Sequence, residues 1–484
     1  MSGMAYISTR GKAEALDFAG VLLAGLARDG GLYVPQRWPA LDGDALGALR
    51  GRSYAEVAHA VMRPYVGGAI GDQALREMIE AAYGPFDHAL VAPLVQIGAN
   101  QWLMELWHGP TLAFKDVAMQ LLGRLYDHVL AERGERVTLI GATSGDTGSA
   151  AIEAIRHCER ARIFILHPHN RTSEVQRRQM TTVDAPNVHN IAVEGTFDDC
   201  QALVKAMFGD AAFRDEHNLS GVNSINWARV CPQIVYYVHA AVALGAPDVA
   251  VSFAVPTGNF GDIYAGYAAR QMGVPIRRLV IASNVNDILT RALTTGDHAL
   301  SDVVPTMSPS MDIQVSSNFE RLLFDMLGRD GEAVEALMGQ LRSERRFAID
   351  GPVLERMRAV FGAYRVDEAQ TLAVMQRMYE RTGELIDPHT AVGVGAAWRA
   401  AEEADATDRA TPMVVLSTAH PAKFPDAVEK ATAHRPPLPE HLADLYERPE
   451  RYTVLPSDEA AVKAFVRDNG ESGGGGAWAG GGLL

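Results

Sequence analysis

Cysteine is scarce in this sequence of 484 residues. The three cysteines, Cys158, Cys200 and Cys231, are far apart and odd in number, and none of them belongs to a C-x-x-C pattern. A disulfide framework and a cysteine-based metal site are therefore not expected. Because stable disulfides belong mainly to oxidising compartments, this cysteine usage predicts a cytoplasmic protein.

Positive charge is also in short supply. The chain has 44 lysines and arginines against 59 aspartates and glutamates, which gives a net charge of −15. A surface of this sign repels phosphodiester backbones and anionic lipids, so neither nucleic acid nor a membrane is expected as the main partner. The charge balance does not exclude a small anionic substrate, because a few local hydrogen-bond donors can outweigh the field of the whole molecule.

Long apolar runs are missing as well. The first residues, MSGMAYISTRGK, contain no apolar core of the kind found in signal peptides, and the run FAGVLLAGLA at 18–27 is too short to span a bilayer. No solenoid-like repeat is visible. The final segment, 471–484, is dominated by glycine and is expected to be disordered. Length and composition are those of a soluble globular protein of the size of an enzyme, with two to four domains or subdomains.

What the sequence does contain is an alternation of short apolar segments with helical stretches, which predicts an α/β protein with a mainly parallel sheet. Residues 318–380 are charged and strongly helical in pattern, and we interpret them as a helical insertion. The expected domains are a mostly helical N-terminal domain at 1–95, a catalytic region of two subdomains at 96–430, and a C-terminal segment at 431–484. The strand candidates are WLMELW (102–107), RVTLIGAT (136–143), RIFILHP (162–168), NVHNIAVEG (187–195), VAVSFAVPTGN (249–259), RRLVIASN (277–284) and PMVVLSTAHP (412–421).

One lysine lies at a junction between a loop and a helix. In HGPTLAFKDVAMQLLGRLY (108–126), a glycine-proline turn leads to Lys115, and an amphipathic helical pattern follows it. Position alone gives Lys115 no chemical role, because most lysines near helix starts are solvated surface groups. A role requires partners elsewhere in the chain.

Two loops that follow strand candidates could bind anions. In LIGATSGDTGSAAIEAI (139–155) and FAVPTGNFGDIYAGYAA (253–269), a strand runs into a glycine-rich turn and then into a helix. The N–H groups at such a helix start can hold a phosphate or a carboxylate, and the small residues allow close approach. Neither loop is a Walker loop, because no Lys-Ser/Thr pair follows the glycines. The simpler interpretation of the first loop is an ordinary Ser/Thr/Asp helix cap.

Six ordered motifs, HGPTLAFKD, ATSGDTGSAA, NSINWARV, TGNFGD, DPHTAVG and LSTAHPAKFP, resemble those of the threonine synthase family of bacterial and fungal type. The resemblance extends from YISTRG and DGGLYVP near the N-terminus, through VQRRQMTT and SPSMDIQVSSNFERLLF, to about residue 430. It implies a fold-type II pyridoxal-phosphate enzyme, similar to the tryptophan synthase β-chain, with parallel sheets wrapped by helices. The expected assembly is a monomer or a homodimer.

The resemblance assigns the cofactor pyridoxal 5′-phosphate to named residues. Lys115 is the implied Schiff-base lysine, which also moves protons, and Phe114 is a candidate for the cofactor wall, although plain core packing explains Phe114 equally well. Asp116 is expected only to hold the helix start. Asp146 stands where related enzymes place an Asn against the cofactor's 3′-oxygen. The phosphate is expected on Gly258, Asn259, Phe260, Gly261 and Asp262, with Asp262 turned away to brace the loop, and Thr418 is expected at the pyridine nitrogen.

The substrate implied by the resemblance is O-phospho-L-homoserine. Thr143, Ser144 and Thr147 are expected to hold its α-carboxylate, and Asn223, Ser224 and Arg229 its phosphate, because a guanidinium can donate two parallel hydrogen bonds to a phosphate. The simpler interpretation of Arg229 is a structural salt bridge. Asn226 is a weaker candidate, and the histidines of LHPHN (166–170) lack metal-ligand spacing and are interpreted as loop residues, so no metal is expected.

The implied reaction is a γ-elimination of phosphate followed by β-addition of water, which gives L-threonine. Two alternatives remain open at this point. A threonine-synthase-like phospho-lyase would release 2-oxobutyrate from the same substrate, and a catalytically idle paralogue would act only as a binding module. A serine or threonine dehydratase is less favoured, because it would leave Asn223, Ser224 and Arg229 without a function.

Overall fold

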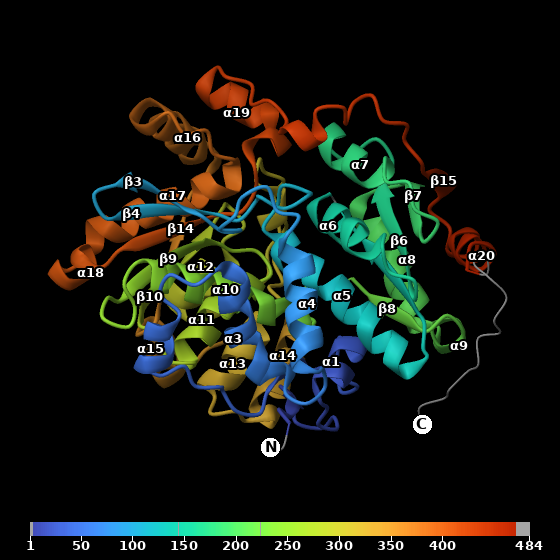
Figure 1. The fold of residues 1–484 in the computed structure, drawn as a ribbon, viewed down its shortest axis with the longest axis horizontal. Helices are drawn as coiled ribbons and strands as arrows, with labels where there is room; N and C mark the ends of the chain where they lie inside the picture. Colours follow the sequence, from blue (N-terminus) through green and yellow to red (C-terminus); the bar gives the residue numbers. More distant parts are fainter. Residues whose placement is uncertain (1–2, 144, 223, 471–484) are drawn as a thin grey trace. The chain divides into compact units, whose positions relative to one another are not determined.

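The computed structural model describes residues 3–143, 145–222 and 224–470 (Figure 1). The chain forms two compact units, and each is made of segments distant in sequence. Unit 1 consists of Met1–Leu121 and Ser224–Leu438, and unit 2 consists of Leu122–Asn223 and Pro439–Leu484. The boundaries of these units differ from those of the predicted domains. The division into a domain at 1–95, a catalytic region at 96–430 and a segment at 431–484 therefore stays a prediction.

Unit 1 is built on a six-stranded sheet with the strand order β13-β10-β9-β14-β4-β3. All neighbouring strands are parallel except β3, which is antiparallel to β4. Parallel strands bring all their carboxyl ends to one edge, where the loops that follow them meet. The strands are β3 (Leu94–Gly98), β4 (Gln101–Glu105), β9 (Val251–Pro256), β10 (Ile276–Ser283), β13 (Phe361–Arg365) and β14 (Met413–Ser417).

Helices cover both faces of this sheet, as the alternation of its side chains requires. Ala254 and Val280 belong to a buried cluster with residues of α16 (Glu368–Thr382) and α17 (Pro388–Glu403). The neighbouring residue Leu279 points to the opposite face, where α11 (Gly261–Gln271) comes so close that its Gly266 has room for no side chain: a Cβ there would lie 2.9 Å from Leu279. Next to α11 runs α10 (Trp227–Ala243), almost every residue of which is buried.

The remaining elements of unit 1 surround this core. The N-terminal part contains a two-stranded antiparallel sheet and four helices, in agreement with its mostly helical pattern. The predicted insertion at 318–380 is helical only in part, because β12 and β13 lie inside it and β13 forms the edge of the main sheet. The elements are β1 (Tyr6–Ser8), α1 (Phe18–Ala24), β2 (Tyr33–Pro35), α2 (Gly43–Ala48), α3 (Tyr54–Val66), α4 (Asp72–Tyr83), α12 (Ile288–Thr295), β11 (Asp297–Ala299), α13 (Phe319–Met326), α14 (Gly331–Glu344), β12 (Arg346–Ala348), α15 (Gly351–Arg358), α18 (Ala406–Ala410) and α19 (Pro425–Thr432).

Unit 2 contains a five-stranded, fully parallel sheet with the order β15-β7-β6-β5-β8. The first helix of this region, α5 (Lys115–Arg133), begins in unit 1 and continues into unit 2. The C-terminal segment contributes a strand and a helix, of which Val462 and Val466 are fully buried. The elements are β5 (Val137–Ala142), α6 (Asp146–Ile155), β6 (Ala161–Pro168), α7 (Glu174–Thr181), β7 (Val188–Glu194), α8 (Phe197–Gly209), α9 (Ala211–Glu216), β8 (Leu219–Gly221), β15 (Thr453–Pro456) and α20 (Glu459–Asp468).

All seven predicted strands are confirmed, as β4, β5, β6, β7, β9, β10 and β14. The three cysteines are free and buried. Within 3–143, 145–222 and 224–470, no helix combines the length and the apolar character needed to cross a bilayer. The glycine-rich end, for which disorder is predicted, lies outside the described residues.

Candidate active site

The loops after β4 and β14 are joined to each other at the carboxyl edge of the six-stranded sheet. The N–H of Phe114 donates to the carbonyl of Thr418 at 2.8 Å, and the N–H of His420 donates to the carbonyl of Leu112 at 3.0 Å. Between these bonds, Ala113 and Ala419 form an antiparallel bridge. The residues before Lys115 are thus held against the residues that follow β14.

Lys115 is the first residue of α5 and is half-buried. Its Nζ lies 3.5 Å from the Oγ of Ser310 and 5.1 Å from the ring centre of Phe114. Asp116 is fully buried, and its two carboxylate oxygens accept from the N–H and the hydroxyl of Thr111 at 2.8 and 2.7 Å. These bonds agree with the predicted local role of Asp116 at the helix start.

The loop after β9 offers backbone N–H groups to a ligand. Phe260 has a left-handed backbone, with φ of 64°, at the position before α11, and no side chain caps this helix. The Phe260 ring packs on Phe319 and Phe361, so only the backbone of Phe260 can reach a ligand. A Cβ at Gly258 would lie 2.6 Å from the carbonyl oxygen of Ser310, so the close approach requires glycine. An uncapped helix start beside a glycine is suited to a phosphate.

Asp262 links this loop to α10 through hydrogen bonds. Its Oδ1 accepts hydrogen bonds from the hydroxyls of Tyr236 and Tyr237 at 2.5 and 2.9 Å, and Tyr237 also donates to the backbone carbonyl of Asp262. Burial raises the pKa of Asp262 to about 6, while the two tyrosine hydroxyls and the charge of Lys115 act in the opposite direction. The prediction that Asp262 turns away from the phosphate and braces the loop agrees with these contacts.

A chain of polar contacts leads from the amine to α17. The N–H of Ser310 donates to Nε2 of His389 at 3.2 Å, and Nδ1 of His389 lies 2.8 Å from the carboxylate of Asp387. Since Nε2 accepts, Nδ1 carries the ring proton and donates a hydrogen bond to Asp387. Thr390 binds the same carboxylate and contacts Ser417 Oγ at 3.2 Å, next to Thr418. These residues fix Ser310 and Thr418, which is 6% exposed.

A second polar group ties the phosphate loop to the segment around Ser224. The side-chain amide of Asn318 donates to the carbonyls of Ser224 and Asn259 at 3.2 and 3.0 Å. Arg321 is fully buried, binds Asn318 and donates to the carbonyls of Ile225 and Tyr33. Burial lowers the pKa of Arg321 to about 10. This one guanidinium joins three distant segments of unit 1.

Arg229 lies in the first turn of α10 and is 5% exposed. Asn226 caps the same helix, because its side chain accepts from the N–H of Ala228 at 2.9 Å and donates to the carbonyl of Leu22 at 2.8 Å. A structural role therefore explains Asn226, the weaker of the predicted phosphate ligands. Asn223 lies outside the described residues.

The remaining candidates form a turn within unit 2. Thr143 Oγ1 accepts from the N–H groups of Gly145 and Gly148 at 3.0 and 3.1 Å, which leaves its hydroxyl hydrogen able to donate. The carboxylate of Asp146 accepts from Gln176 at 2.8 Å and is buried. Thr147 is half-buried, and Ser144 lies outside the described residues. The N–H groups of Gly145 and Gly148 thus hold the shape of the turn, and within the described residues no N-cap side chain caps the start of α6.

The sequence reasoning missed Ser310, His389, Asn318 and Arg321 as parts of this site. Their motifs, SPSMDIQVSSNFERLLF and DPHTAVG, contributed to the resemblance, yet no role was assigned to any residue in them. The available signal was the polar residues in these two motifs. Asn318 and Arg321 were interpreted as part of the charged insertion at 318–380, whereas Ser310 and His389 lie outside it and no local pattern marks them.

Three family models match the chain. "Threonine synthase N terminus" matches residues 5–83, "Pyridoxal-phosphate dependent enzyme" matches residues 90–338, and "Threonine synthase, C-terminal" matches residues 390–466. The last match corrects the expected end of the resemblance near residue 430, because the family pattern continues through β15 into α20.

Individual relatives match over almost the whole chain. The threonine synthase of Pseudomonas aeruginosa is 55% identical over 97% of this chain and 99% of its own, and the Saccharomyces cerevisiae enzyme is 42% identical over 91% and 93%. Human threonine synthase-like 2 is 35% identical over 93% and 94%. The structure of pyridoxal-phosphate-bound threonine synthase from Brucella melitensis superposes with a TM-score of 0.94, at 54% identity over 97% of this chain and 100% of that one.

Proposed function

Because the chain belongs to the threonine synthase family, we propose that it converts O-phospho-L-homoserine and water into L-threonine and phosphate. The family depends on pyridoxal phosphate. The observation that carries the proposal is the placement of the Lys115 amine beside Ser310, whose carbonyl in turn packs against Gly258 at the uncapped start of α11.

The residues of unit 1 fit this cofactor. The backbone N–H groups from Gly258 to Gly261 would hold its phosphate, and the missing side chain at Gly258 lets this loop lie against the carbonyl of Ser310. Thr418 would face the pyridine nitrogen with a neutral hydroxyl, and Lys115 would bind the aldehyde carbon. When bound, the cofactor supplies an electron sink for negative charge that develops on the substrate's carbons.

The amine of Lys115 is proposed to take the proton from the substrate's Cα, to release that proton again, and then, as a free amine, to take a proton from Cβ. Ser310 and the charge of Asp262 keep this amine in position between the two transfers. General base catalysis of this kind contributes roughly 10²–10⁴-fold to a rate. Water must stay away from Cγ until phosphate has left and must then add at Cβ.

The departing phosphate is proposed to be held by Arg229, Ser224 and Asn223. A guanidinium stabilises the charge that develops on a leaving phosphate by two charge-assisted hydrogen bonds. Asn318 and Arg321 would hold the proposed phosphate ligands in place, because they donate hydrogen bonds to the backbone carbonyls of Ser224 and Ile225. In unit 2, Thr143, Ser144 and Thr147 are proposed for the α-carboxylate, and Asp146 for the cofactor's 3′-oxygen.

We also propose a cytoplasmic location, supported by three free and buried thiols, and a monomer or homodimer as the working assembly.

A phospho-lyase remains the second candidate function, because threonine synthase-like 2 of Xenopus laevis and of Homo sapiens are both 35% identical to this chain. The higher identity to enzymes named threonine synthase favours synthesis.

The test is a product assay on one substrate. Purified holoenzyme is incubated with O-phospho-L-homoserine, and phosphate, threonine and 2-oxobutyrate are measured in the same sample. Equal amounts of phosphate and threonine are expected. Equal amounts of phosphate and 2-oxobutyrate would assign the lyase instead, and the absence of phosphate release would leave a binding module.

A further inference from the structure

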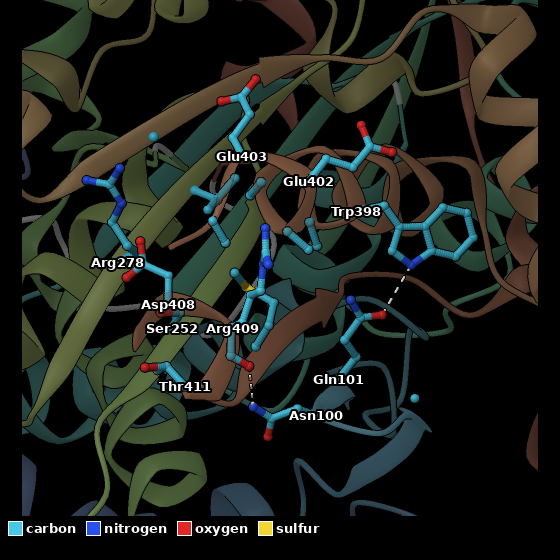
Figure 2. A pocket seen from close by; sticks show the side chains of 18 of the residues that line it. Asn100, Gln101, Ser252, Arg278, Trp398, Glu402, Glu403, Asp408, Arg409 and Thr411 are labelled. Carbon is cyan, nitrogen blue, oxygen red and sulfur yellow. Dashed lines mark hydrogen bonds between the residues drawn. The ribbon is translucent and has the colours of Figure 1, made fainter. Parts of the chain in front are cut away.

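Unit 1 contains a second concave site, on the edge of the sheet opposite to Lys115. A cavity of about 470 Å³ opens at the amino ends of the strands (Figure 2). Its lining includes Gln101 at the start of β4, Ser252 in β9 and Met413 at the start of β14. Thr418 follows the other end of β14, about 17 Å away along a five-residue strand. The cavity therefore shares no residue with the proposed catalytic centre.

Positive charge dominates the groups of this lining that are available to a ligand. Within the described parts of the chain, no hydrogen bond or ion pair engages the guanidinium groups of Arg377, Arg381 and Arg409. Of the three acidic groups, Asp408 is paired with Arg277 at 2.8 Å and Glu403 accepts from the Tyr364 hydroxyl at 2.7 Å, while Glu402 keeps its negative charge beside the arginines. Three free guanidinium groups in a protein of net charge −15 favour an anion.

The same lining has flat aromatic surfaces. The guanidinium of Arg377 lies over the ring of Trp398, 4.7 Å from its centre, and the indole N–H of Trp398 donates to Gln101 at 3.2 Å, which fixes the ring. Tyr364 is held by its bond to Glu403. Figure 2 shows Trp398 and Gln101 on one side of the cavity, Arg278 and Ser252 on the other, and Arg409 between them. A flat ring can stack on an indole or on an arginine plane.

We propose that this cavity is a binding site for an organic anion that carries a flat ring, of the chemical class of nucleoside monophosphates. The phosphate would bind Arg381 and Arg409, and the ring would stack beside Trp398 and Arg377. The volume lies within the range of small-molecule sites, and an inorganic phosphate alone would leave most of it unfilled. The free side-chain N–H group of Gln101 and the hydroxyls of Ser252 and Thr411 can contact a sugar or a ring edge.

Two elements of unit 1 extend from this cavity to the proposed catalytic centre. α17 ends at the cavity and carries His389 and Thr390 in its first turn, and β14 runs from Met413 to the residue before Thr418. A ligand that contacts Trp398 and Met413 touches both elements.

The test is a titration of the holoenzyme with adenosine monophosphate, adenosine and inorganic phosphate by isothermal calorimetry. The monophosphate is expected to bind at least tenfold more tightly than either fragment. The double variant Arg381→Gln/Arg409→Gln is expected to weaken monophosphate binding at least tenfold. Arg435→Gln, at an exposed arginine of the same unit outside the cavity, serves as the matched control and is expected to bind like the parent.

Three results would overturn the proposal. The first is the absence of monophosphate binding at millimolar concentration. The second is equal affinity for the monophosphate and inorganic phosphate, which would remove the role of the ring. The third is unchanged monophosphate affinity in the double variant, which would place binding elsewhere, including at the catalytic centre. None of these results depends on which product the enzyme makes.

Discussion

Asp262 and Lys115 are two ionisable residues whose charges are coupled beneath the phosphate loop. Burial favours the neutral carboxyl and raises the pKa of Asp262 to about 6, whereas the charge of Lys115 and the tyrosine hydroxyls favour the carboxylate. The folded pKa is higher than the unfolded value of 3.8, so the folded state binds more protons between these values. The contribution of Asp262 to the free energy of unfolding therefore falls as pH rises from about 4 to about 6, by about 3 kcal/mol at most.

Asp262→Asn removes this titration and keeps an oxygen that can accept from Tyr236 and Tyr237. In the apoenzyme, the difference in unfolding free energy between variant and parent is expected to be small at pH 4 and to move in favour of the variant by ~2 kcal/mol at pH 8. Urea unfolding at both pH values measures it. A difference that does not change with pH would contradict the assigned pKa.

Arg321 allows a test of the hydrogen bonds that hold the segment around Ser224, which is proposed to bind the substrate's phosphate. Arg321→Met leaves the carbonyls of Tyr33 and Ile225 and the side chain of Asn318 without their donor, and is expected to destabilise unit 1 by roughly 3 kcal/mol. It is also expected to raise the KM for O-phospho-L-homoserine, because Ser224 and Ile225 lose their fixed position.

Arg342→Met is the control, since Arg342 is an exposed arginine on α14 whose ion pair with Glu335 contributes little. Its unfolding midpoint and KM are expected to stay close to those of the parent. Equal effects of the two substitutions would show that the Arg321 bonds are dispensable.

At the scale of elements, the close approach between the β9–α11 loop and the 3-10 turn at Pro309–Met311 depends on glycine. Gly258→Ala places a Cβ 2.6 Å from the carbonyl of Ser310, so the loop must move. Cofactor affinity is expected to fall at least tenfold, as measured by titration of the apoenzyme with pyridoxal phosphate. Gly339→Ala, inside α14 where a Cβ meets nothing closer than 4.0 Å, is expected to leave the affinity unchanged and to stabilise the helix by about 1 kcal/mol.

Elements differ in how well the sequence predicts them. The seven strand candidates are long apolar runs between turn residues, and this pattern is sufficient to find them. β13, FGAYR, was missed because it lies between charged helices in a segment whose overall pattern is helical. β15 was missed for a similar reason, since a sheet-edge strand that alternates between half-buried and exposed residues has no apolar run.

At the scale of the whole molecule, each unit is assembled from segments distant in sequence. Unit 2 is complete only with its C-terminal strand and helix, because Val462 and Val466 of α20 pack with Phe164 and Met207 in one buried cluster. Contacts of this range also explain why part of the active site was not predicted. Lys115 and Ser310 are 195 positions apart, and no local pattern connects them.

Val466→Asp tests whether the C-terminal helix is part of unit 2. A buried charge at this position is expected to destabilise unit 2 by ~3 kcal/mol or more, as measured by urea unfolding followed by circular dichroism. Ala464→Asp introduces the same charge at an exposed position of the same helix and is expected to change stability by less than about 0.5 kcal/mol. Similar unfolding curves for the two variants would contradict the packing of α20 in unit 2.

The central claim is that Lys115, at the carboxyl edge of the six-stranded sheet, is the residue that binds the cofactor covalently. Its most direct test is borohydride reduction of the holoenzyme, digestion, and mass spectrometry of the peptides, with Lys115→Ala treated in parallel. The account predicts that the cofactor's mass is found on the peptide that contains Lys115 and on no peptide of the variant, which also loses the visible absorbance of the parent. Attachment to another lysine, or an unchanged absorbance in Lys115→Ala, would contradict it.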